Sequence, residues 1–232
     1  MDNNRTLSIV DNIFIKVFNQ INKFTLDEIR EKFAYEINLP RKVKDNITME
    51  ETYTNFLKGS HFVIDKNMRK NNICMMRKKE RINSFDDIME IWNQINFITT
   101  ERVVDSTNVS KSDKIFGSND VYMCTSCSNS NNIIYCDCVN NCEYVLASKG
   151  TDNCNYCICS CDSSSSSNSF GITWSNKIVN SMFILDCNNL YECMFCAHIG
   201  HKRFCIANMQ FEEKEYYEIK EKIIEYILSN KI

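Results

Sequence analysis

The chain has 232 residues and a net charge of −3 at pH 7, so no global field favours binding to nucleic acid or to an anionic membrane. A hydrophobic content of 44% and an aromatic content of 11% exclude wholesale disorder. No apolar run approaches the length of a transmembrane helix, and the N-terminus lacks the basic and apolar stretches of a secretory signal. We therefore expect an intracellular, cytoplasmic protein of one or two domains.

Residues 1–97 are predicted to be a mostly helical N-terminal region. Thr25 followed by Glu28 is a capping-box pattern, and apolar residues follow it at helical spacing. The same device, with a serine cap, predicts a second amphipathic helix over 84–95. Between these helices, the alternation of apolar and polar residues in HFVID, residues 61–65, favours a short strand.

The middle of the chain repeats with a period of three. From Val103 to Cys205, every third residue is Ser, Thr, Cys, Val, Ile or Leu, and Lys202 is the one exception. A period of three fits neither a helix nor a flat strand. It is typical of a narrow β-solenoid in which each short side contributes one inward side chain, and small residues suit such a lumen. Residues 98–210 are therefore predicted to form a solenoid.

The length of one coil follows from a second pattern. Steps of twelve residues from Tyr122 to Ile206 select outward positions, and all of them are apolar. Twelve residues per turn explain both the interior and this outer row, and they give about nine coils stacked at roughly 4.8 Å. Together with residues 211–232, predicted to be an amphipathic C-terminal helix, the expected fold class is α+β.

The outer row and the residues that follow it form an apolar surface, which we call the ridge. Its residues are Tyr122, Met123, Ile134, Tyr135, Met182, Phe183, Met194 and Phe195. Contiguous exposed apolar surface usually marks an interface, so the ridge is expected to dock a partner. The alternative, of equal weight, is that the protein covers the ridge itself. The helices at 84–95 and 212–229 flank the solenoid and are expected to cap its ends or to cover the ridge.

The run CDSSSSSNSF looks like a flexible linker within the solenoid. However, Ser163, Ser166 and Ser169 fall on the inward series, and Phe170 falls on the outer row. A linker has no reason to keep a twelve-residue register. The run is therefore predicted to be a coil with a serine lumen.

Thirteen of the 14 cysteines fall between Cys124 and Cys205. Without a secretory signal, a reducing compartment and free thiols are expected. The ligand types of one cluster suit zinc. The cluster consists of Cys193, Cys196, His198, His201 and Cys205. In the predicted register, the cysteines of this set point inward and the histidines point outward. Packing is therefore the favoured role of these residues, and zinc binding is the alternative. No other cofactor is expected.

Other cysteines also form patterns with two interpretations. Cys124/Cys127 and Cys154/Cys157 resemble metal or redox pairs, but they are consecutive inward residues, which favours packing. Some cysteines one coil apart are close enough for a disulfide. These pairs are Cys124/Cys136, Cys142/Cys154 and Cys193/Cys205. Thiols remain the expectation for all of them.

Residues 41–81 carry 11 Lys or Arg and 5 Asp or Glu. Such a basic segment can bind a phosphate backbone, although a solvated helical face is the favoured interpretation. The chain contains no glycine-rich phosphate loop and none of the common hydrolase motifs, and three histidines leave little for acid–base catalysis. No catalytic residue is predicted.

The units NIIYC (Asn132–Cys136) and NCNYC (Asn153–Cys157), with the ending Arg203–Ile223, resemble a family of Cys-rich β-solenoid repeat proteins from bacterial candidate phyla and large viruses. The resemblance covers roughly residues 98–230. The architecture is also similar to the 12-residue-coil insect antifreeze β-helix, although the ice-binding threonine row is missing. These resemblances imply a fold and a repeat type, and no activity.

Three functions follow as expectations. The first is a non-enzymatic structural or protein-interaction scaffold, with a minor virion or assembly component as one case, in which partner proteins of a larger assembly dock on the ridge. The second is a nucleic-acid-associated regulator that uses residues 41–81. The third is a zinc- or redox-binding module. No membrane partner is expected.

Overall fold

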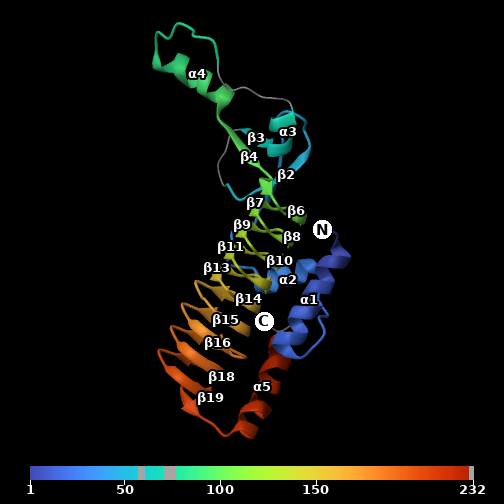
Figure 1. The fold of residues 1–232 in the computed structure, drawn as a ribbon, viewed down its shortest axis with the longest axis vertical. Helices are drawn as coiled ribbons and strands as arrows, with labels where there is room; N and C mark the ends of the chain where they lie inside the picture. The colour runs from blue at the N-terminus through green and yellow to red at the C-terminus, as the bar shows by residue number, and fades with distance from the viewer. Residues whose placement is uncertain (57–60, 71–76, 230–232) are drawn as a thin grey trace.

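A computed structural model describes residues 1–56, 61–70 and 77–229, and a long β-solenoid dominates it (Figure 1). Helices from both ends of the chain lie along one side of the solenoid, and a small outlying region precedes its first coil. The fold is thus α+β, with a solenoid of about nine turns, as the periodicity predicts.

The region before the solenoid contains both helices and strands. Its described elements are α1 (Asn3–Phe18), α2 (Leu26–Phe33), β1 (Arg41–Lys44), β2 (Glu51–Thr54), β3 (His61–Ile64), α3 (Asp65–Lys70), α4 (Phe85–Ile95) and β4 (Phe97–Thr100). Strands β1 and β2 form an antiparallel hairpin, and β3 pairs in parallel with β4. The capping boxes predicted before α2 and α4 are both formed, and HFVID contains β3.

The solenoid forms one sheet of short strands, and a helix follows it. The strands are β5 (Val103–Val104), β6 (Thr107–Ser110), β7 (Asp113–Phe116), β8 (Asn119–Tyr122), β9 (Thr125–Ser128), β10 (Asn131–Ile134), β11 (Asp137–Asn140), β12 (Glu143–Leu146), β13 (Lys149–Asp152), β14 (Asn155–Cys161), β15 (Ser167–Thr173), β16 (Asn176–Val179), β17 (Met182–Leu185), β18 (Asn188–Ala197), β19 (Gly200–Ile206) and β20 (Met209–Gln210). The helix is α5 (Glu213–Leu228).

The register of the sheet confirms the twelve-residue coil. Val121 lies opposite Ile133, which lies opposite Val145, and each step is one coil. Backbone N–H groups of one coil donate to carbonyls of the preceding coil, as Tyr135 N does to Tyr122 O at 3.0 Å. Stacking therefore satisfies the backbone polar groups that a buried strand must pair.

The period of three has a backbone cause. Every third residue from Asp105 to Ala207 has a positive φ, so each three-residue side ends in a left-handed bend. This conformation costs most residues roughly 1–2 kcal/mol and is least unfavourable for Gly, Asn and Asp. Asn and Asp are accordingly frequent at these positions, for example Asn129, Asn141 and Asn153. The inward residues follow each bend, which places four of them in each coil.

Serine and cysteine side chains in the lumen form ladders of hydrogen bonds with the backbones of successive coils. The hydroxyl of Ser118 donates to the Phe116 carbonyl at 2.9 Å and accepts from the Ser130 N–H at 3.1 Å. Cys124 repeats the pattern, because its thiol donates to the Tyr122 carbonyl at 3.1 Å and accepts from the Cys136 N–H at 3.3 Å. Small hydroxyl and thiol groups thus bridge successive coils, and Val, Ile and Leu fill most of the other lumen positions.

The serine run is a coil and not a linker, as predicted. Ser163, Ser166 and Ser169 are buried, and Ser169 lies opposite Cys157 of the preceding coil. One ladder ends at Ser160, whose hydroxyl has no hydrogen-bond partner among the described residues. The next ladder begins three residues later at Ser163, which accepts from the Ser175 N–H at 3.4 Å.

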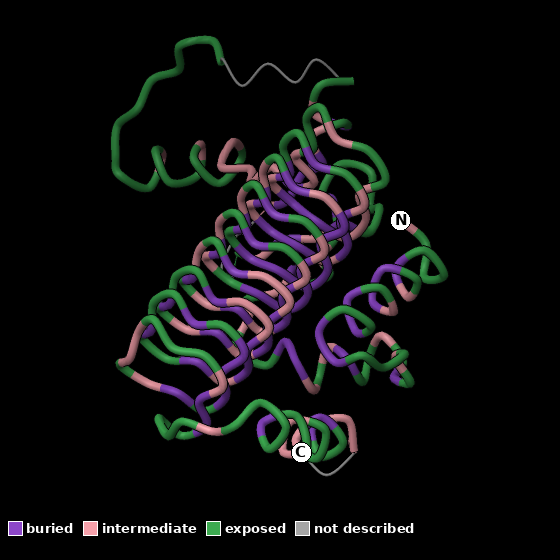
Figure 2. Tube along the Cα trace, turned by 60° about the horizontal axis from the view of Figure 1, so that its bottom comes forward, coloured by how far each residue is buried: buried purple, intermediate pink, exposed green. Residues whose placement is uncertain are grey.

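Of the two flanking helices, the one at 212–229 covers the ridge as expected, whereas the one at 84–95 differs in position from the expectation. The 84–95 helix forms as α4, but none of its residues is buried and it stands away from the solenoid (Figure 1). The prediction that it caps the first coil or covers the ridge is therefore wrong. Helix α1 does the covering instead, together with α2 and with α5, which folds back along the solenoid (Figure 2). An apolar stripe on a helix predicts that the helix packs against another surface, but it does not identify that surface.

Candidate functional site

The predicted zinc set is divided between two sides of the solenoid wall. Cys193, Cys196 and Cys205 are buried in the lumen, whereas His198 and His201 are exposed outside it. His198 Nδ1 lies 3.0 Å from a carboxylate oxygen of Asp186, and His201 Nδ1 lies 2.9 Å from the Asn189 amide. One metal ion cannot reach both sets, since its ligands lie about 2.0–2.3 Å away. The described part of the chain holds no group of three or more potential metal ligands.

The Cys-x-x-Cys pairs are also lumen residues. Cys124, Cys127, Cys154 and Cys157 are all buried, and all 13 described cysteines are free thiols. Burial raises the pKa of the Cys124 thiol well above its ordinary value, and neighbouring thiols add to the effect. A buried thiol with a raised pKa is a poor nucleophile and a poor ligand. These pairs therefore pack the lumen and bridge its coils.

The N-terminal half of the ridge is covered by the protein's own helices. Ile134 and Tyr135 are buried in one cluster with the apolar face of α1. The Tyr135 hydroxyl donates to the Leu26 carbonyl at 3.0 Å, which ties α2 to the ridge. Farther along, the ring of Phe170 packs edge-on against those of Phe18 and Phe33. Of the two alternatives for this half of the ridge, cover by the protein itself is the one that the structure supports.

Helix α5 covers one flank of the C-terminal half. Tyr216 and Ile227 are buried in the same cluster as the ridge residues Met182 and Met194. A buried ion pair holds the helix there, because Lys220 Nζ lies 2.9 Å from a Glu192 carboxylate oxygen and 3.2 Å from the Asn180 carbonyl oxygen. Displacement of α5 would leave the Glu192 carboxylate buried without this partner, so the pair favours the observed position of the helix.

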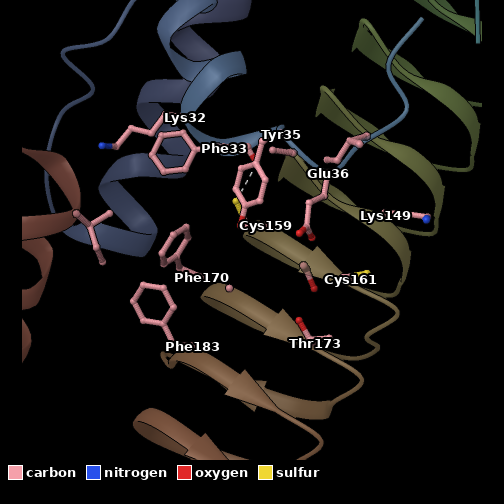
Figure 3. A pocket seen from close by; sticks show the side chains of 15 residues that line it. Lys32, Phe33, Tyr35, Glu36, Lys149, Cys159, Cys161, Phe170, Thr173 and Phe183 are labelled. Atoms are coloured by element: carbon pink, nitrogen blue, oxygen red, sulfur yellow. Dashed lines mark hydrogen bonds between the residues drawn. The ribbon is translucent and has the colours of Figure 1, made fainter. Parts of the chain in front are cut away.

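Between these covers, part of the ridge remains open, and we call this opening the ridge groove. Its first hollow has a volume of about 370 Å³ and lies between the segment after α2 and the solenoid (Figure 3). Phe33, Phe170 and Phe183 form its apolar wall, and Gly171 also lines it, where a Cβ would lie 3.3 Å from the Phe183 ring. At the other wall, the Cys159 thiol donates to the Phe33 carbonyl at 3.2 Å.

A second hollow continues the groove past Phe183 toward α5. It has a volume of about 290 Å³, and its lining is almost entirely apolar. The lining residues are Phe183, Phe195, Ile219, Lys222, Ile223, Tyr226 and Ile227. Phe183 and Ile227 belong to both hollows, which makes them one continuous surface. The rings of Phe183 and Phe195 are stacked at 4.6 Å, and Phe195 is 47% exposed.

The rim of the ridge groove carries more positive than negative charge. Lys32, Lys149 and Glu36 border the first hollow, and Lys222 borders the second. Lys32 Nζ also donates to the Ser229 carbonyl at 3.2 Å, and burial lowers the pKa of Lys32. The groove thus combines an apolar floor with a net positive rim, which suits a ligand that has apolar side chains between acidic ones.

The sequence predicted part of this site. Of the eight ridge residues, Phe183 and Phe195 line the groove, Met123 is partly buried, and the other five are buried. The 212–229 helix was expected as a possible cover of the ridge, and three isoleucines of its apolar face line the second hollow. Tyr35, from the segment after α2, and Tyr226 of α5 were not predicted. The only feature of the sequence that marks these two tyrosines is a charged residue next to each of them along the chain.

Part of the basic segment 41–81 is engaged in ion pairs in the described structure. Lys42 pairs with Glu51 at 2.7 Å, and Arg69 pairs with Asp65 at 2.7 Å. Its basic residues are spread over β1, α3 and the chain before α4. Residues 57–60 and 71–76 of this segment lie outside the described residues.

The chain matches no protein-family model, no curated protein and no solved structure. The resemblances stated from the sequence therefore rest on the β-solenoid and on the many cysteines, which the structure shares with them. None of the described helices has the length and hydropathy that a membrane crossing requires.

Proposed function

We propose that this protein is a non-enzymatic scaffold that binds a partner protein in the ridge groove. The ligand is a short protein segment with apolar side chains flanked by Asp or Glu. The observation that carries the proposal is the stacked pair Phe183 and Phe195, which remains accessible beside a ridge that is otherwise covered. Large aromatic side chains in an apolar pocket are the usual anchors of protein interfaces.

The solenoid suits this role because it is stiff. Each coil is hydrogen bonded to the next through backbone and lumen, so the groove has a fixed shape before a ligand arrives. A preformed site avoids the entropic cost of ordering on binding. The same proposal has three further parts. The protein belongs to a larger assembly, such as a virion, and it is related to the Cys-rich solenoid families. It resides in a reducing intracellular compartment, where its thiols stay free.

Selection of peptides from a random display library tests the proposal. The full-length protein is the bait, and the affinity of each selected peptide is then measured by fluorescence anisotropy. We expect peptides with aromatic or aliphatic anchors and acidic neighbours. The variant Phe195→Asp should weaken their binding by at least about tenfold, since a hot-spot aromatic contributes roughly 2 kcal/mol or more.

The matched control is Trp174→Asp. Trp174 is also an exposed aromatic residue with a positive φ on the solenoid, and it does not line the groove. Aspartate tolerates a positive φ at both positions, so both variants should fold. Equal binding by the two variants, or a selection that returns no apolar and acidic peptides, would refute the proposal.

A further inference from the structure

Helix α4 presents an apolar face that nothing in the described structure covers. None of its residues is buried, and Phe85 is 71% and Trp92 52% exposed. Phe85, Ile88, Trp92 and Ile95 follow one another at spacings of three and four residues, which places them on one side of the helix. An isolated helix of this length is marginal in water, so such a face is typical of one that docks elsewhere.

All of the charged residues of α4 are acidic. Asp86, Asp87 and Glu90 are its only ionisable residues, and the helix contains no Lys or Arg. The capping box at Ser84 engages Asp87, and hydrogen bonds from backbone N–H groups lower the pKa of that carboxyl, which keeps it charged at neutral pH. The helix is therefore an apolar segment flanked by acidic side chains.

That description matches the ligand that the ridge groove is built to accept. The groove has an apolar floor around Phe183 and Phe195, and three lysines and one glutamate border it. The acidic residues of α4 and the lysines of the rim have opposite charge, and this favours docking of the one on the other. A membrane surface is a poorer partner for α4, because acidic side chains beside the apolar face repel anionic headgroups.

The two surfaces of one molecule lie far apart. Helix α4 precedes the first coil, whereas the first solenoid residue of the groove, Ala147, lies about four coils later, or roughly 19 Å along the solenoid. Helix α4 of one molecule is thus placed to reach the groove of another.

We propose that α4 of a second copy of this chain occupies the ridge groove, an inference that rests on the proposed function of the groove. Trp92 and Ile88 then pack against Phe183 and Phe195, and Asp86 and Glu90 approach the lysine rim. The contact joins two different patches, so each molecule offers one helix and one groove and can join two neighbours.

Complementation between two variants tests this contact by sedimentation velocity. Trp92→Asp removes the helix anchor, and Phe195→Asp removes the groove anchor. We expect the wild-type protein to associate at micromolar concentrations, with a mass that rises with concentration, and each variant alone to be monomeric. An equimolar mixture should form a one-to-one heterodimer and nothing larger, because one intact helix and one intact groove remain. Trp174→Asp, the control, should associate like the wild type.

A charge exchange adds a second test. Lys149→Glu with Lys222→Glu should weaken association by about tenfold, and Asp86→Lys with Glu90→Lys in the second copy should restore it. Both changes lie on exposed residues, so folding should not depend on them.

The outcomes separate the two proposals. A wild-type protein that stays monomeric at 100 µM overturns the second-copy contact, and peptide binding to the groove would still stand if display succeeds. If the Phe195→Asp variant still associates with itself while the Trp92→Asp variant does not, α4 of one copy pairs with α4 of another. That result would also overturn the inference. Folding of each variant is checked by circular dichroism.

Discussion

The two halves of the ridge have the same repeat and the same apolar chemistry, yet they differ in exposure. In the N-terminal half, Ile134 and Tyr135 are at most 1% exposed because α1 and α2 pack on them. In the C-terminal half, Phe195 occupies the same coil position as Tyr135 and is 47% exposed. Accessibility along a repeat is therefore set by segments distant in sequence, and a groove can arise where two covers fail to meet.

The largest expected effect is a difference in the free energy of unfolding between a substitution in the helices that cover the ridge and one in the ridge groove. Phe14 is fully buried among Phe18, Phe24 and Phe33. Phe14→Ala should lower the free energy of unfolding by about 3–5 kcal/mol, because it leaves a cavity beneath the cover. Phe195→Ala should cost less than about 1 kcal/mol, since its ring is half exposed. Urea unfolding measures both, and equal losses would mean that the two halves are not covered differently.

A smaller effect is expected at the boundary between the halves, where the lumen ladders change rows. Ser181 donates to the Val179 carbonyl at 2.8 Å and accepts from the Cys193 N–H at 3.0 Å. Ser181→Ala should lower the free energy of unfolding by about 1–3 kcal/mol, because it leaves a buried N–H unpaired.

Ser160→Ala is the matched change, and it should be neutral or stabilising because the Ser160 hydroxyl has no partner among the described residues. Thermal unfolding of the two variants ranks them directly. A larger loss for Ser160→Ala than for Ser181→Ala would contradict the ladder arrangement.

The smallest effect is a difference in reaction rate between two cysteines two residues apart. The Cys159 thiol lies under the cover and donates to the Phe33 carbonyl, and burial raises its pKa. Burial also raises the pKa of Cys161, and the Asp162 carboxylate adds to the rise, but this thiol is less buried than that of Cys159.

Iodoacetamide reacts with the thiolate, so both rates should be low at pH 7 and should rise as the pH increases toward and above 9. At every pH, Cys161 should react at least about tenfold faster than Cys159, because its thiolate forms more readily and is more accessible. Peptide mapping by mass spectrometry gives the two rates. Equal rates would show that the segment after α2 does not hold its place on the solenoid.

The sequence was sufficient for the solenoid but not for its surroundings. Inward positions, coil length and the serine coil could be predicted, because the lumen takes Ser, Thr, Cys and aliphatic side chains, with Lys202 as the exception, and the same selection acts on every coil. The left-handed bends were missed, although the Asn, Asp and Gly residues found at many of these bend positions carry that signal. The role of α1 was missed and that of α4 was wrong, since an amphipathic face does not specify its partner surface. The groove is lined by α5 and by the segment after α2 as well as by the solenoid, so of the predicted ridge residues only Phe183 and Phe195 line it.

The left-handed bend at every third residue restricts how a chain of this kind can change in length. An insertion of one or two residues would turn every later inward side chain to the outside. Three residues inserted in an early coil preserve the interior but rotate all later faces by a quarter turn, which would carry Phe183 away from Phe33 of α2. Twelve residues add one coil of roughly 4.8 Å and leave each face in line. Growth and loss in such a protein are thus expected in whole coils, and the distance between α4 and the groove is expected to vary among relatives in steps of that size.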